Sequence, residues 1–176
     1  EFCTKHNVEF HMIKKTHSPR TSFVTYVYSL LKILKQLLPL TENDIVESIS
    51  VLEDTQKLIN SKNLSETNTS IILSQKISDI PLIYYPHGLE AAAIRFKSSL
   101  QENAKSHVII EDIIESCHNG IVAWEKPSLL HPILIQGSDD YFKTKERWQI
   151  LKKYFDENNI KYFDIFSTNG NILSKL

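Results

Sequence analysis

The feature that most constrains the fold is a regular alternation of short apolar runs and helical stripes from Ile80 onward. The apolar runs have the length of buried strands and span residues 81–85, 107–110, 133–135 and 160–166. Helical patterns lie between or after them, at residues 89–100, at 140–155 and from 171. Strands that alternate with helices build mostly parallel sheets. The sequence therefore predicts an α/β fold with a doubly wound sheet and helices on both faces.

The first 79 residues follow a different pattern. Residues 8–14 alternate as a strand does, and Pro19 ends this strand because proline can neither donate to a ladder nor continue a helix. A helix is predicted over 23–38, and Thr41 is the expected N-cap of the next one. The polar stretch 61–70 indicates a loop or a domain boundary before the α/β pattern begins.

The composition is that of an ordinary globular protein, with 41% hydrophobic and 23% charged residues and a formal net charge of -1. Lys and Arg are scattered among the acids, so we expect no nucleic-acid partner. The longest apolar stretch, 23–40, is interrupted by polar residues and predicts no membrane span. The only cysteines, Cys3 and Cys117, lack metal-ligand spacing, which favours a reducing cytoplasm over a disulfide framework.

Three glycines mark the expected carboxyl ends of strands. Gly88, Gly137 and Gly170 each follow a strand and precede a helix, and parallel sheets bind ligands in the crevice at this edge. The alternative is that glycine permits a tight turn there. No Gly-x-Gly-x-x-Gly or Gly-Lys-Ser/Thr motif is present, so dinucleotide or nucleoside-triphosphate binding has no local support.

Glu102 is the first candidate catalytic residue. On a helical wheel, Arg95, Ser98 and Glu102 lie at spacings of three and four, away from the apolar stripe. Glu102 would project from the last helical turn, where the macrodipole opposes its negative charge and favours proton uptake. A carboxylate of this kind suits a general base. The alternative is a solvated ion pair between Glu102 and Lys105.

His118 is the second candidate, in a turn marked by Asn119-Gly120. A histidine there can act as an acid or a base, and the alternative is a solvated loop residue. Cys117 beside it could be a nucleophile or a metal ligand, but without a second ligand at metal spacing it is interpreted as a small core residue. The remaining histidines are too dispersed to indicate a metal site.

Arg20 is a candidate anion-binding residue because it follows Pro19 at the expected carboxyl end of the first strand. A guanidinium there could meet an anion or an oxyanion. The alternative is a surface arginine that only completes the loop.

Together, these segments resemble the bifunctional phosphoglucose/phosphomannose isomerases of the sugar isomerase (SIS) superfamily. The resemblance is carried by three blocks, which are Pro19-Arg20-Thr21-Ser22-Phe23, Arg95-Phe96-Lys97 with Gln101-Glu102-Asn103-Ala104-Lys105, and Cys117-His118-Asn119-Gly120-Ile121 with Trp124-Glu125. Their order and spacing agree with the family across most of the chain.

The resemblance implies a doubly wound SIS fold and part of a two-domain protein. Residues 1–40 would be the tail of a first SIS domain, 41–79 a helical connecting segment and 80–176 a truncated second SIS domain. The phosphate-binding Ser/Thr loop of the first domain would lie upstream of Glu1, and a family active-site lysine would lie beyond Leu176.

The resemblance also implies a reaction, the interconversion of fructose 6-phosphate with glucose 6-phosphate and mannose 6-phosphate through a cis-enediolate. Glu102 would move the proton between C2 and C1, His118 would open the sugar ring, and Arg20 would stabilise the enediolate. The family needs no metal or organic cofactor. It is dimeric, and the histidine of one subunit lies near the glutamate of the other.

Two residues depart from the family pattern and leave other functions open. Gly120 replaces the usual acidic residue after His-Asn, and Cys117 replaces the usual Asn. They motivate a non-catalytic SIS domain that binds a phosphosugar for regulation. A third alternative is an interaction domain that uses the helix over 23–38.

Overall fold

The computed structural model describes residues 1–13 and 18–176, without the side chains of Pro19 and Arg20. The chain divides into two compact units, residues 1–42 and 43–176, which are described separately. In the described ranges, no helix is both long enough and apolar enough to cross a membrane.

The first unit is helical. It contains α1 (Phe2–Lys5), a 3-10 turn η1 (Pro19–Ser22) and α2 (Phe23–Ile33). The predicted helix begins at Phe23 as expected, but it ends before residue 38 because the chain turns at Leu34. The predicted strand is wrong over residues 8–13, which form no strand. Alternation alone cannot make a strand without a neighbouring strand to pair with. Lys14 lies outside the described residues.

The second unit contains a parallel sheet of four described strands, β1 (Ile80–Tyr85), β2 (Ile109–Asp112), β3 (Leu130–Gln136) and β4 (Phe163–Phe166). The strand order is β2-β1-β3-β4. Residue Ile83 at the centre of β1 pairs in register with Ile110 on one side and Ile133 on the other. The predicted α/β fold with a parallel sheet is confirmed.

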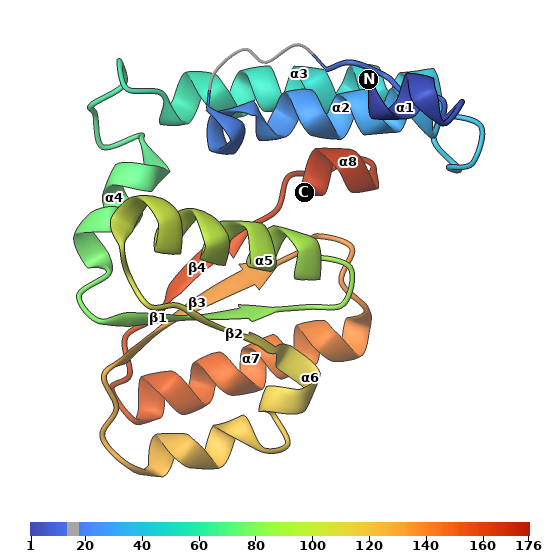
Figure 1. The fold of residues 1–176 in the computed structure, drawn as a ribbon. Helices are drawn as coiled ribbons and strands as arrows, with labels where there is room; N and C mark the ends of the chain where they lie inside the picture. Colours follow the sequence, from blue (N-terminus) through green and yellow to red (C-terminus); the bar gives the residue numbers. More distant parts are fainter. Residues whose placement is uncertain (14–17) are drawn as a thin grey trace. The chain divides into compact units, whose positions relative to one another are not determined.

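Helices cover both faces of this sheet (Figure 1). The helices of the second unit are α3 (Glu42–Ile59), α4 (Thr69–Lys76), α5 (Glu90–Ser99), α6 (Ile113–Ser116), α7 (Phe142–Glu157) and α8 (Ile172–Lys175). The helix α5 crosses one face, whereas α6 and α7 lie on the other. The start of α3 fixes α8, because the Asn171 side chain donates to the Asp44 carbonyl at 3.0 Å.

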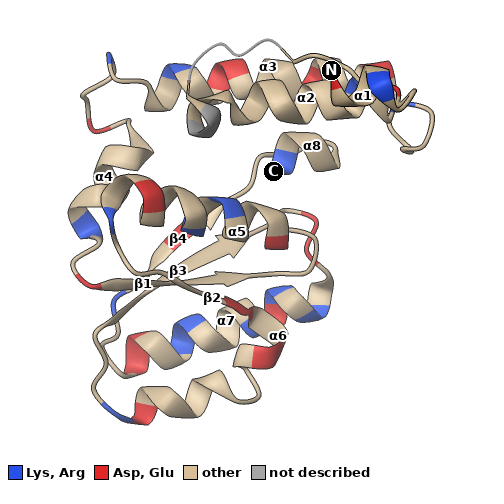
Figure 2. Ribbon diagram, in the orientation of Figure 1, with Lys and Arg blue, Asp and Glu red and all other residues tan. Residues whose placement is uncertain are grey.

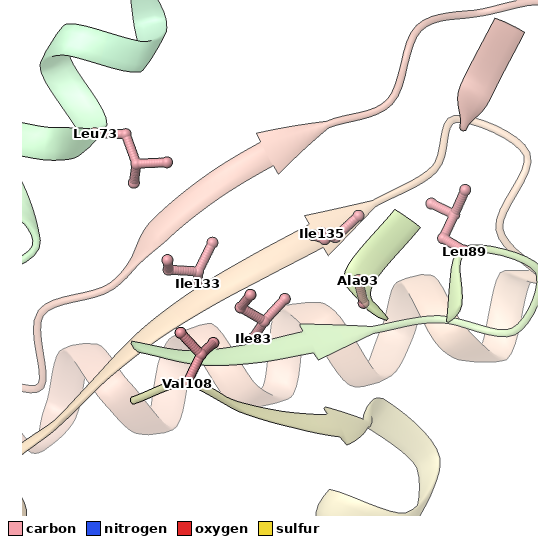
Figure 3. Packing of buried hydrophobic residues seen from close by; sticks show 7 residues of the cluster. All are labelled: Leu73, Ile83, Leu89, Ala93, Val108, Ile133 and Ile135. Carbon is pink, nitrogen blue, oxygen red and sulfur yellow. The ribbon is translucent and has the colours of Figure 1, made fainter. Parts of the chain in front are cut away.

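Each sheet face has its own apolar core because successive strand residues point to opposite sides. Residue Ile83 of β1 faces α4 and α5, and its cluster contains Leu73, Leu89, Ala93, Val108, Ile133 and Ile135 (Figure 3). Residues Leu82 and Tyr84 face the other way and pack against Trp148, Leu151 and Phe155 of α7. Continuous burial along β1 is therefore the consequence of helices on both faces.

Charged residues of both signs are interspersed on the helices of this unit, as along α5 and α7 in Figure 2. In α7, for example, Lys143 lies 2.8 Å from Glu146. Mixed charge of this kind is typical of a solvated helix face rather than of a polyanion-binding surface.

Candidate functional site

The sheet has a topological switch point between β1 and β3. From β1 the chain passes through α5 to β2 on one side, and from β3 it passes through α7 to β4 on the other side. A cavity of about 380 Å³ lies at the carboxyl ends of these two strands. It includes Gly88 and Gly137, and Gly88 has a left-handed φ of 90° that glycine adopts without strain. Gly120 and Gly170 are not part of this cavity's lining.

The helix α5 carries Glu102 away from that edge. It begins at Glu90, directly after the turn at Gly88, and Leu89, Ala93 and Phe96 hold it against the sheet. Because it follows a parallel strand and leads to the next one, it runs back to the amino ends of the strands. Glu102 therefore lies at the amino-end side of the sheet.

Glu102 is in a π-helical turn, η2 (Leu100–Ala104), rather than in the last α-helical turn predicted from the sequence. Lys105 ends the turn with a left-handed φ of 58°, and its Nζ donates to the Glu102 carbonyl at 2.6 Å. Asn103 Nδ2 donates to the Ser99 carbonyl at 3.0 Å. The Glu102 side chain is exposed. Short π-helical turns often occur at functional sites.

His118 lies at the opposite edge, in the turn between α6 and a 3-10 helix, η3 (Gly120–Glu125). Residue Glu115 holds this turn, because its carbonyl accepts hydrogen bonds from the backbone N–H groups of His118 and Asn119, both at 3.0 Å. The Asn119 side chain also donates to the Glu115 carboxylate. The His118 side chain itself is exposed.

The helix α6, which leads into this turn, is capped at its N-terminus by Asp112. Asp112 Oδ1 accepts hydrogen bonds from the N–H groups of Ile114 at 2.7 Å and Glu115 at 3.2 Å. We expect Asp112→Ala to lower the free energy of unfolding by about 1 kcal/mol, because both N–H groups lose their acceptor. Asp112→Ser, which can still cap, should retain most of this stability. Urea unfolding of both variants measures the difference, and equal losses would contradict the capping role.

Cys117 is half-buried and packs against the α7-side core, beside Ile121 and Trp124. Burial is the main cause of the raised pKa of its thiol. A raised pKa disfavours the thiolate that a nucleophile or a metal ligand requires. The interpretation of Cys117 as a core residue agrees with both observations. Among the described residues, no three His, Cys, Asp or Glu side chains gather as metal ligands do.

Sequence reasoning missed Glu111, a half-buried carboxyl group on β2. A Cβ atom at Gly120 would lie only 2.7 Å from Glu111 Oε1, so the glycine and the carboxyl group share one small space. Burial, together with the charge of Glu115, raises the pKa of Glu111. The pattern that could have revealed it is a carboxylate at the end of the short strand β2, directly before the capping Asp112.

The raised pKa of Glu111 predicts a pH-dependent stability. The folded protein binds the carboxyl proton of Glu111 more tightly than the unfolded chain does. The stability that this proton contributes is therefore fully present below the pKa that Glu111 has in the unfolded chain, and it is lost as the pH rises through the higher pKa of the folded protein. Glu111→Gln should therefore be more stable than the wild type at pH 7 and no more stable at pH 4. Urea unfolding at both pH values tests this, and a wild type that is the more stable protein at pH 7 would contradict it.

Within the second unit, the structure does not bring Glu102 and His118 together. Glu102 lies on the side of the amino ends of the strands and His118 on the side of their carboxyl ends, and α5 spans roughly 15 Å between these two sides. Arg20 lies in η1 of the first unit, and its side chain is outside the described part of the structure. The strand that was expected to place Arg20 is absent over residues 8–13.

Comparisons with known proteins agree with the fold. The sequence model of a family described as the bacterial phospho-glucose isomerase C-terminal SIS domain matches residues 66–176. The C-terminal domain of glucosamine-fructose-6-phosphate aminotransferase from Francisella tularensis has the same fold, with a TM-score of 0.54 and 14% identity over 93% of this chain and 49% of that chain.

A bifunctional phosphoglucose/phosphomannose isomerase from Caldicellulosiruptor bescii is 25% identical over 186 residues, which cover all of this chain and 54% of the relative. The chain thus spans about half the length of this curated relative. Both Glu102 and His118 lie within the range that the family model matches. Residues 66–176 make this chain a member of the family of bacterial phosphoglucose isomerase C-terminal SIS domains.

Proposed function

We propose that the intact protein is an aldose-ketose isomerase that interconverts fructose 6-phosphate with glucose 6-phosphate and mannose 6-phosphate. The observation that carries this proposal is the family match over residues 66–176, which contains both candidate acid/base residues. The similarity to a bifunctional phosphoglucose/phosphomannose isomerase supports the pair of aldose products.

In the proposed reaction, His118 opens the sugar ring by exchanging protons with the ring oxygen and the anomeric hydroxyl group. The Glu102 carboxylate then takes the C2 proton of the aldose and returns it to C1, while the O2 hydroxyl group gives its proton to O1. The intermediate is a cis-enediolate, planar at C2, which explains how one base could serve both glucose and mannose phosphates. The Arg20 guanidinium would stabilise the negative charge of this intermediate. The reaction uses no metal and no organic cofactor.

A homodimer would reconcile this mechanism with the topology. Within one chain, Glu102 and His118 are too far apart to act on one sugar, because proton transfer requires contact at about 3 Å. Two copies arranged around a two-fold axis can place Glu102 of one beside His118 of the other.

We further propose that residues 1–40 belong to an upstream SIS domain and that residues 41–79 connect this domain to the second SIS domain, residues 80–176. We also propose that the protein works in the cytoplasm.

The decisive experiment is an assay of the intact protein with fructose 6-phosphate, in which glucose 6-phosphate and mannose 6-phosphate are measured separately. The proposal expects both products. Binding of the sugar phosphate without turnover would instead favour a regulatory phosphosugar-binding domain, the function that the departures at Gly120 and Cys117 motivate. Absence of binding would contradict both functions.

A further inference from the structure

Two polar side chains outside the proposed mechanism lie side by side on the sheet. Tyr84 of β1 and Glu111 of β2 are register partners, so they project from the same face. Tyr84 is only 1% exposed. Its hydroxyl oxygen accepts a hydrogen bond from Trp124 Nε1 at 3.0 Å. An indole N–H can only donate, so the Tyr84 hydroxyl keeps its own proton to give.

That proton has no acceptor among the described residues, since the only hydrogen bond of the Tyr84 hydroxyl is the one it receives from Trp124. Burial raises the pKa of the Tyr84 phenol, which keeps the donor protonated. Glu111 is in the complementary position, because no described residue donates a hydrogen bond to its carboxyl group. Half-buried polar groups without partners are costly, and a native structure normally satisfies them.

A cavity of about 290 Å³ lies where these groups meet. Tyr84, Glu111, Gly120 and Trp124 all line it. Gly120 helps to keep it open, since a side chain at this position would meet Glu111 Oε1 at 2.7 Å and push the carboxyl group into the free space. The volume is at the lower end of those of small-molecule sites, which suits a compound no larger than a monosaccharide.

We propose that this cavity binds a neutral polyhydroxy compound through a hydroxyl group placed between Tyr84 and Glu111. A hydroxyl group accepts one hydrogen bond and donates another, so it matches the donor of Tyr84 and the acceptor of Glu111 at once. The ring of Trp124 supplies an apolar surface for the C–H groups of such a compound. An anion is disfavoured, because Glu111 lines the cavity and the Glu115 charge is close enough to act on it.

The test uses the 176-residue chain with glucose as the probe and the two indole N–H resonances, of Trp124 and Trp148, as reporters. Tyr84→Phe removes the acceptor of Trp124, so the resonance that it shifts identifies Trp124. We expect glucose to shift the Trp124 signal with about millimolar affinity and to leave the Trp148 signal in place. No shift of Trp124 at about 100 mM glucose would overturn the proposal.

Two variants test the contacts. Tyr84→Phe and Glu111→Leu should each weaken glucose binding by about tenfold, the effect of one lost hydrogen bond. The matched control is Glu157→Leu, at an exposed position on α7 that is not part of the cavity lining, which should bind as the wild type does. Thermal unfolding of each variant checks that it is folded. Unchanged binding by folded Glu111→Leu would overturn the assignment.

A third arm distinguishes this cavity from the isomerase site. Glucose 6-phosphate should bind at Trp124 no more tightly than glucose does, because the carboxyl groups oppose the phosphate. Tenfold tighter binding of the phosphate at the same resonance would overturn the proposal for a neutral ligand. The measurement needs no isomerase activity, so its failure would leave the proposed reaction standing.

Discussion

Glu102→Gln is expected to reduce isomerase turnover of the intact protein by about 10³-fold, because glutamine cannot accept the proton that moves between C2 and C1. The substitution preserves the size of the side chain on the exposed π-helical turn, so folding and sugar-phosphate binding should change little. A coupled assay for glucose 6-phosphate measures turnover, and incorporation of solvent deuterium at C2 measures the proton transfer itself.

Ring opening should survive in this variant, because it is assigned to His118. Exchange between the α and β anomers of glucose 6-phosphate, followed by NMR, reports that step separately. Glu53→Gln provides the matched control, since it makes the same change at an exposed position of α3. Turnover of Glu102→Gln close to that of the control would exclude Glu102 as the base. It would leave the proposed isomerase reaction itself in place.

Mixed dimers of Glu102→Gln and His118→Asn are expected to recover activity that neither variant has alone. If each site combines Glu102 of one chain with His118 of the other, the mixed dimer contains one intact site and one doubly defective site. Its turnover should therefore be roughly half that of the wild type, as two-fold symmetry requires. The expectation follows from the sheet topology, which keeps the two residues of a single chain apart.

The experiment requires co-expression of the two variants with different affinity tags and purification through both. Wild-type dimers that are purified through the same two tags give the reference turnover. Each single variant, purified in the same way, sets the background. A mixed dimer no more active than its parents would show that the sites do not combine these residues across subunits.

Periodicity predicted the architecture of the second unit well, because burial of β1 and β3 on two faces leaves long apolar runs in the sequence. The boundaries were less accurate. β2 spans Ile109–Asp112 rather than 107–110, but a shift of two residues leaves each side chain on its predicted face. The strand predicted over residues 8–13 is an error of another kind. These residues alternate in hydrophobicity, but they pair with no described strand and therefore form none.

The candidate site was also predicted only in part from the sequence. Local signals located the Glu102 helix and the His118 turn, because both depend on nearby residues. They could not reveal that helix α5 changes to a π-helical turn at Leu100, since the apolar stripe reaches Leu100 at ordinary α-helical spacing. Nor could they reveal the pair of Tyr84 and Glu111, which arises only from the register of two strands.

The π-helical turn that carries Glu102 also makes this part of the chain sensitive to length. A π-helical turn accommodates one residue more than an α-helical turn does. Loss of a single residue between Leu100 and Ala104 would let α5 continue as an ordinary helix and would rotate Glu102 by about 100° around its axis. The direction in which the carboxylate points is thus set by the number of residues in the turn, and a deletion would be more damaging there than most substitutions.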